Sequence, residues 1–71
     1  MPTFGERLKE LRIEKNVTQK ELADYLEIAI NAYQRYEYDQ RAMNIKTLTA
    51  LADYFDVSID YLVGRSDQRG R

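Results

Sequence analysis

The chain has 71 residues, a formal net charge of −1, and neither cysteine nor histidine. A chain this short forms one domain with a marginal core, because it buries only about 60% of the surface that it exposes when unfolded. The missing residue types exclude disulfides, the usual zinc-ligand sets and any catalytic centre that needs a thiol or an imidazole. We therefore expect no metal, no cofactor and no enzymatic activity.

Hydropathy predicts a soluble, cytoplasmic chain with no membrane partner. No apolar run approaches the roughly 18 residues needed to span a bilayer, and the first ten residues lack the apolar core of a signal peptide. Residues 29–46 carry three basic and two acidic side chains, a modest basic excess. The acidic residues concentrate further along, and we interpret them as helix caps and solvated charge rather than as a metal or acid–base site: Asp53, Asp56 and Asp60.

A first helix is predicted over residues 3–15. Thr3 and Glu6 have the spacing of a capping box, in which the two side chains satisfy free amides at a helix start. The apolar stripe at helical spacing is Phe4, Leu8 and Leu11. The polar side chains assigned to the solvent side are Arg7, Lys9, Glu10, Glu14 and Lys15. The helix is expected to end near Asn16, since asparagine tolerates the left-handed conformation.

Two shorter helices are predicted over residues 18–26 and 29–37. Thr18 and Glu21 again fit a capping box. The buried edge of this helix is expected to be Leu22, Ala23 and Leu26. Residues 27–29 are too few for a loop and indicate a tight corner. The following helix lacks a good N-cap, because Ala29 has no side-chain acceptor. Its expected inward-facing residues are Ile28, Tyr33 and Tyr36.

Two further helices are predicted before a polar tail. Asn44 is expected to cap a helix over residues 44–55, whose apolar positions are Ile45, Leu48, Leu51, Ala52 and Phe55. Ser58 is expected to cap a short helix that Gly64 terminates. Residues 65–71 are polar and are predicted to be a frayed tail outside a domain of residues 1–64. Since no strand pattern is present, the predicted fold is an all-α domain of five helices.

Four different short motifs follow one another along the chain at a characteristic spacing. They are Thr18-Gln19-x-Glu21-Leu22-Ala23, Arg35-Tyr36-Glu37, Asn44-Ile45-x-Thr47-Leu48 and Val57-Ser58-x-Asp60-x-Leu62. This pattern resembles the phage-repressor and Cro-like helix-turn-helix family of the xenobiotic-response-element type, over roughly residues 4–64. The resemblance implies a compact lambda-repressor-like domain whose second and third helices form the helix-turn-helix, with the third helix in the DNA major groove.

Two positions depart from the family pattern. The corner residue, usually glycine, is Glu27, and a positive φ at this residue would cost on the order of 1 kcal/mol. The usual hydroxyl cap and polar first residue of the third helix are replaced by Ala29 and Ile30. These replacements weaken the helix start and remove a hydrogen-bonding reader, although an apolar side chain can still contact a thymine methyl group.

The resemblance implies three contacts with base edges, by Ile30, Asn31 and Arg35. Asparagine pairs bidentately with adenine and arginine with guanine, and each good pair contributes roughly 1–3 kcal/mol of discrimination. Other roles stay open for each residue: a local helix cap for Asn31, an internal salt bridge for Arg35, and simple exposure for Ile30.

The resemblance also implies contacts with the sugar–phosphate backbone. The helix start at residue 18 presents free amides and a partial positive charge, which suit a phosphate. The implied backbone contacts are Thr18, Gln19, Gln34, Tyr38, Gln40, Arg41 and Lys46; the alternative for each is an ordinary solvated side chain. Arg12 and Glu37 resemble the family's internal ion pair and are assigned to structure, where loss of one partner would cost about 3–5 kcal/mol.

The implied function is a sequence-specific, double-stranded DNA-binding transcriptional regulator, expected to be a repressor. A single helix makes few base contacts, so we expect a homodimer on a palindromic operator with half-sites about one helical turn apart. The predicted dimer interface is Tyr54, Val57, Ile59, Tyr61 and Val63; the alternative is that these side chains only seal the core.

A second hypothesis is a protein-interaction module of the same fold, such as an antitoxin-like or anti-repressor-binding protein. The acidic stretch and the apolar start of the third helix favour it. No sensor domain is evident in the sequence, so we expect no small-molecule ligand. Control would then come from concentration, from proteolysis or from a regulatory protein partner.

Overall fold

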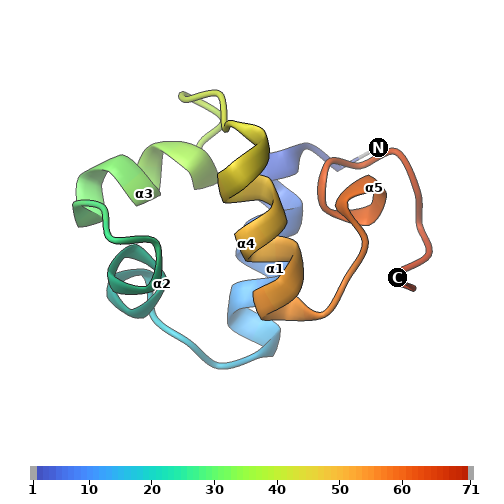
Figure 1. Ribbon diagram of the computed structural model, residues 1–71, viewed down its shortest axis with the longest axis horizontal. Helices are drawn as coiled ribbons and strands as arrows, with labels where there is room; N and C mark the ends of the chain where they lie inside the picture. The colour runs from blue at the N-terminus through green and yellow to red at the C-terminus, as the bar shows by residue number, and fades with distance from the viewer. Residues whose placement is uncertain (1, 71) are drawn as a thin grey trace.

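The computed structural model describes residues 2–70, and every regular element within that range is an α-helix (Figure 1). The helices are α1 (Phe4–Glu14), α2 (Gln19–Leu26), α3 (Ile30–Glu37), α4 (Ile45–Phe55) and α5 (Ile59–Leu62). The predicted all-α, five-helix fold is confirmed.

Side-chain caps set the starts of four of the helices. Thr3 and Glu6 form the predicted capping box at α1. The side chains of Thr18, Asn44 and Ser58 accept backbone amides at the starts of α2, α4 and α5. Helix α3 has no side-chain cap, which confirms the prediction made from alanine at position 29. Because short helices are marginal in isolation, α3 depends on packing against its neighbours.

Left-handed residues end several of the helices. Asn16, Glu27 and Asp56 have φ values of 61°, 59° and 55°, so the predicted turn at Asn16 is confirmed. Glu27 adopts at the α2–α3 corner the conformation that glycine usually takes. The corner is supported by a backbone hydrogen bond of 3.0 Å from the Ile28 amide to the Ala23 carbonyl oxygen, and Ile28 packs against the core.

The helices divide the molecule into a two-helix end and a scaffold. Helices α2 and α3 lie together at one end, α1 and α4 occupy the middle, and α5 lies at the other end (Figure 1). Helix α1 packs against both α3 and α5, and α4 packs against α5. The scaffold therefore fixes the angle at which α2 and α3 are presented.

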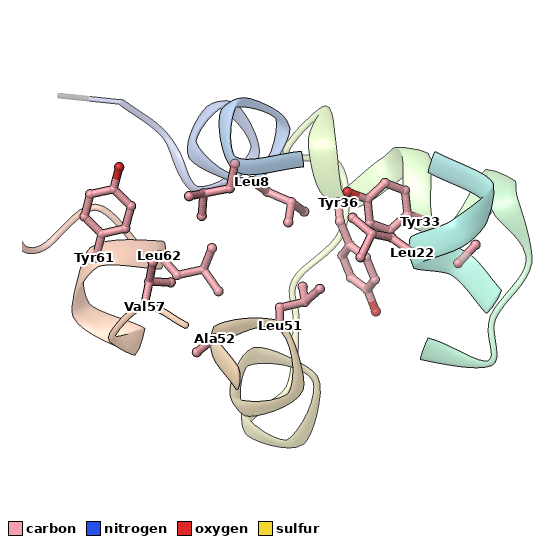
Figure 2. Packing of buried hydrophobic residues seen from close by; sticks show 11 residues of the cluster. Leu8, Leu22, Tyr33, Tyr36, Leu51, Ala52, Val57, Tyr61 and Leu62 are labelled. Atoms are coloured by element: carbon pink, nitrogen blue, oxygen red, sulfur yellow. The ribbon is translucent and has the colours of Figure 1, made fainter. Parts of the chain in front are cut away.

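One apolar core joins all five helices. Figure 2 shows Leu22 and Tyr33 meeting between α2 and α3, Tyr36 extending from α3 toward Leu51, and Val57, Tyr61 and Leu62 on the α5 side. Tyr33 and Tyr36 are 0% and 4% exposed, so their prediction as inward residues is confirmed. The full set of buried apolar residues is Leu8, Leu11, Leu22, Ala23, Tyr33, Tyr36, Leu51, Ala52, Val57, Tyr61 and Leu62.

Two predictions about side-chain burial are wrong. Ile45 belongs to the apolar stripe predicted for α4 but is 68% exposed, because it occupies the first position of the helix, one turn before the residues that reach the core. Arg7 belongs to the predicted solvent side of α1 but is 5% exposed. Its Nη1 donates to the carbonyl oxygens of Tyr61 (3.0 Å) and Ser66 (3.2 Å), and its guanidinium lies 3.9 Å from the centroid of the Tyr61 ring.

Residues 65–70 lie against the domain, whereas the polarity of the segment predicts a frayed tail. Arg69 Nη2 donates to Glu14 Oε2 at 2.7 Å, and the Ser58 amide donates to the Arg69 carbonyl oxygen at 3.0 Å. The hydrogen bond from Arg69 lowers the pKa of the Glu14 carboxyl. These contacts connect the tail to α1 and α5.

Within residues 2–70, no helix combines the length and the apolar character needed to cross a bilayer. The same residues contain no group of three acidic side chains arranged to hold a metal ion.

Candidate nucleic-acid interface

The start of α2 has the properties of an anion site. The Thr18 hydroxyl accepts the Glu21 amide at 3.0 Å, which leaves the backbone amides of Gln19 and Lys20 without an acceptor among the described residues. The adjoining groove contains Lys9, Arg12 and Lys20 and no acidic side chain. Lys20 is paired with Asp24, and Arg12 with Glu37, so Lys9 is the cation of this groove that has no ion pair within the described residues. Free amides at the positive end of a helix suit a phosphate group.

The outer face of α3 presents the three predicted base-contacting residues. Ile30 is 44% exposed, and Asn31 and Arg35 are also exposed. Within residues 2–70 the structure shows neither a hydrogen bond nor an ion pair for the side chains of Asn31 and Arg35. The helix cap and the internal salt bridge considered as alternatives for these two residues are therefore not what the structure shows.

A buried carboxylate connects the inner face of α3 to α1. Glu37 Oε2 accepts from Arg12 Nε at 2.6 Å and from the Tyr33 hydroxyl at 2.6 Å. The Arg12 and Glu37 side chains are 14% and 2% exposed, so the ion pair suggested by the resemblance is present. The hydrogen bond to Glu37 raises the pKa of Arg12. Burial, and then the hydrogen bond to Glu37, raise the pKa of Tyr33.

Gln19 and Gln34, the two glutamines predicted to contact the DNA sugar–phosphate backbone, form a hydrogen bond with each other. Gln34 Nε2 donates to Gln19 Oε1 at 3.0 Å, and Gln19 Nε2 donates to Glu37 Oε1 at 3.1 Å. Both side chains are half-buried. The start of α2 and the middle of α3 are thus connected to the buried ion pair by a chain of side-chain hydrogen bonds.

The loop after α3 exposes the remaining candidates for backbone contacts. Tyr38 is 64% exposed, Gln40 and Arg41 are exposed, and the Arg41 guanidinium lies 5.2 Å from the centroid of the Tyr36 ring. Lys46 is exposed at the start of α4. These side chains stand on the same stretch of chain, immediately after the helix that carries Arg35.

The dimer prediction is wrong for two of its five residues. Val57 and Tyr61 are 2% and 5% exposed within a single chain and belong to its core. The Tyr61 ring lies under the Arg7 guanidinium of α1, and both residues complete the small interior of the domain, as the alternative interpretation allowed. Tyr54, Ile59 and Val63 are half-buried and keep part of their surface.

Sequence reasoning missed the role of Asp39. Its carboxylate accepts from the Thr3 hydroxyl at 2.6 Å and from the Gly5 amide at 2.8 Å, so it caps α1 while its own φ of 58° turns the loop after α3. This contact anchors the loop that carries Gln40 and Arg41. No local pattern could have revealed it, since the partners lie more than 30 residues apart in sequence.

Comparison with known proteins agrees with this geometry. A family model described as helix-turn-helix matches residues 8–62. The chain is 42% identical over 60 residues to the SPbeta prophage-derived uncharacterized HTH-type transcriptional regulator YonR of Bacillus subtilis, covering 84% of this chain and 56% of that protein. It is 42% identical over 65 residues to the HTH-type transcriptional regulator ImmR of the same organism, covering 92% of this chain and 51% of that protein.

The chain therefore spans about half the length of the curated relatives that it matches. Among solved structures, the P22 c2 repressor protein in complex with a synthetic operator has the same fold, with a TM-score of 0.83 and 24% identity. The similarity covers 93% of this chain and 100% of that chain.

Proposed function

Because the chain belongs to the helix-turn-helix family, we propose that it is a sequence-specific, double-stranded DNA-binding transcriptional regulator that acts as a repressor. In this proposal α3 enters the major groove and the start of α2 binds a phosphate. The protein acts in the cytoplasm and has no catalytic role. Relatives named as transcriptional regulators support the proposal.

The observation that carries the proposal is the pair of surfaces on α2 and α3. The open amides of Gln19 and Lys20 lie beside cationic side chains, and the exposed face of α3 carries Asn31 and Arg35 with no partner in the described chain. Phosphate contacts fix orientation, whereas side chains aimed at base edges carry sequence information. The two surfaces supply one kind of contact each.

We assign the base contacts to Ile30, Asn31 and Arg35. Asn31 and Arg35 have the donors and acceptors to pair with adenine and guanine, and Ile30 has the apolar surface to meet a thymine methyl group. The backbone contacts that remain directly available are Thr18, Gln19, Tyr38, Gln40, Arg41 and Lys46.

The protein is proposed to bind an inverted-repeat operator as a homodimer. One α3 offers only a few base contacts, and two copies related by a twofold axis would double them. The side chains that keep surface near α5 are Tyr54, Ile59 and Val63, and we place the dimer contact there. A regulatory protein partner would bind the surface of this chain that contacts neither DNA nor the second copy.

A binding-site selection from a random duplex library tests the proposal. We expect one enriched motif with twofold symmetry and half-sites spaced by about one helical turn. Affinity for that duplex, measured as a function of salt, should fall linearly on logarithmic axes, because bound phosphates release counterions. If the selection enriches no motif and binding is insensitive to salt, the regulator hypothesis is wrong and a protein-interaction module takes its place. Light scattering of the same sample, with and without the duplex, measures the dimer.

A further inference from the structure

The amide groups of Gln19 and Gln34 have a fixed direction that originates at the buried Glu37. As a carboxylate, Glu37 can only accept hydrogen bonds. Its two oxygens accept from Arg12, Tyr33 and Gln19, and the side chain is 2% exposed. Gln19 must therefore turn its NH₂ group, and not its carbonyl oxygen, toward Glu37.

This orientation determines what Gln19 offers to its other neighbours. Its Oε1 points away from the carboxylate and accepts from Gln34 Nε2 at 3.0 Å. Reversing the Gln19 amide would place an oxygen against Glu37 Oε1 and an NH₂ group against the NH₂ of Gln34, so both hydrogen bonds would be lost. One hydrogen of Gln19 Nε2 is used by Glu37, and the second is left for an acceptor outside the chain.

We propose that Gln34 is a positioning residue for DNA binding that acts through Gln19. By holding the Gln19 carbonyl oxygen, Gln34 keeps a partial negative charge away from the phosphate expected at the start of α2. The remaining hydrogen of Gln19 Nε2 then joins the open backbone amides in the groove that Gln19 lines. This inference rests on the proposed function and assigns Gln34 a different role from the direct backbone contact implied by the family resemblance.

The burial of Gln34 agrees with a positioning role. Asn31 and Arg35 on the same helix are exposed, whereas Gln34 is half-buried and its NH₂ group is already bonded to Gln19. The first residue of α3, where a polar side chain would reach the start of α2, is Ile30, which makes no such bond. Gln34, one turn further along, supplies the hydrogen bond from α3 that Ile30 cannot.

A double-mutant cycle tests this role with the full chain and the selected operator. The variants are Gln34→Met, Gln19→Met and the double variant, since methionine keeps the length of the side chain and removes its hydrogen bonds. Gln34→Met should weaken binding about 3- to 10-fold, the loss expected for one oriented hydrogen bond. In the Gln19→Met background the same change should have no further effect. Neither the preferred bases nor the salt slope should change, because Gln34 meets no base and carries no charge.

Two results would overturn the inference while leaving the proposed function intact. Equal losses from Gln34→Met in both backgrounds would show that Gln34 touches DNA itself. An altered preference at one base pair would make it a base reader. If instead the wild-type chain selects no duplex, the proposed function fails first, and that outcome is recognised before any variant is made.

Measurements on the free protein separate a positioning role from a loss of folding. Side-chain amide NMR should show slow hydrogen exchange at Gln19 in the wild type and faster exchange in Gln34→Met, with the backbone spectrum otherwise retained. Gln68→Met is the matched control for both measurements, because Gln68 is exposed in the tail and its side chain makes no hydrogen bond among the described residues. This variant should bind the operator as the wild type does and leave the exchange at Gln19 slow. Unchanged exchange at Gln19 in Gln34→Met would also refute the inference.

Discussion

Gly5 in α1 lies directly against the backbone of Glu37 at the end of α3. A Cβ atom at Gly5 would stand 2.4 Å from the Glu37 carbonyl oxygen and 2.8 Å from that of Tyr36. Only glycine permits this approach, since both neighbours are backbone atoms that cannot rotate away. The same crossing brings α1 close enough for Arg12 to pair with Glu37.

Replacing Gly5 with alanine should therefore lower the free energy of unfolding by about 1–3 kcal/mol, the usual range for overpacking at a tight contact. Urea unfolding followed by circular dichroism measures the change. Gly70→Ala is the control, because nothing lies within 4 Å of a Cβ atom at Gly70. If both variants unfold at the same urea concentration as the wild type, the α1–α3 contact leaves room for a methyl group at residue 5.

Because of Tyr33, the free energy of unfolding should fall as the pH rises in the alkaline range. Burial and the hydrogen bond to Glu37 raise the pKa of Tyr33 above its ordinary value of 10.0, so the folded state favours the neutral phenol. The stabilisation is then fully present below pH 10.0 and is lost as the pH rises further. Tyr33→Phe should be less stable than the wild type at pH 7 by about 1.5–3 kcal/mol, since it removes a hydrogen bond to a charged group.

The gap in unfolding free energy between the wild type and Tyr33→Phe should narrow above pH 10.0. Urea titrations at pH 7, 9 and 10.5 would measure it, and Tyr38→Phe, at a tyrosine that is 64% exposed, serves as the control. A gap that stays constant across this range would show that the Tyr33 hydroxyl is not held by Glu37.

The contact between Glu14 and Arg69 predicts a contribution to stability that is lost at acid pH, whereas that of Tyr33 is lost at alkaline pH. The hydrogen bond from Arg69 lowers the pKa of Glu14 below its ordinary value of 4.5. Its contribution is present above that value and is lost as the pH falls through the lowered pKa. Glu14→Gln should therefore melt at a slightly lower temperature than the wild type at pH 7, and the two melting temperatures should converge in acid. The Glu10 carboxylate lies 4.0 Å from Arg69. Glu10→Gln should therefore change the melting temperature less than Glu14→Gln does.

Arg35→Ala should relax base preference at a single position of the operator. Its guanidinium has no partner in the described chain, so the substitution removes a DNA contact without breaking an internal one. Discrimination at that base pair should fall by roughly 1–3 kcal/mol, as measured by competition among operators that differ at one position. Unfolding of this variant, or a uniform loss on all duplexes, would argue against a base contact.

Arg41→Ala should weaken binding to every duplex alike. A phosphate contact carries no sequence information, so the ranking of operators should be unchanged, and the salt slope should become shallower by about one unit. Arg65→Ala is the matched control, because Arg65 is an exposed arginine outside the proposed DNA interface. An unchanged salt slope would place Arg41 away from the phosphates.

The helices and their caps could be predicted from sequence because they depend on neighbours only a few residues apart. Thr18 and Glu21 form their contact within one helical turn, and the spacing of Leu8 and Leu11 defines a buried face without knowledge of what covers it. Exposure of Asn31 and Arg35 follows from the same periodicity, once the inward faces of Tyr33 and Tyr36 are known.

Helix order, caps and the outer face of α3 were thus determined by local sequence, because they depend on periodicity and on bonds within one turn. The tertiary structure alone decided that Arg7 is buried, that Asp39 caps α1, that Val57 and Tyr61 belong to the core, and that Gln34 bonds to Gln19. Each of these contacts joins segments far apart along the chain, and their side chains meet only after the helices have packed.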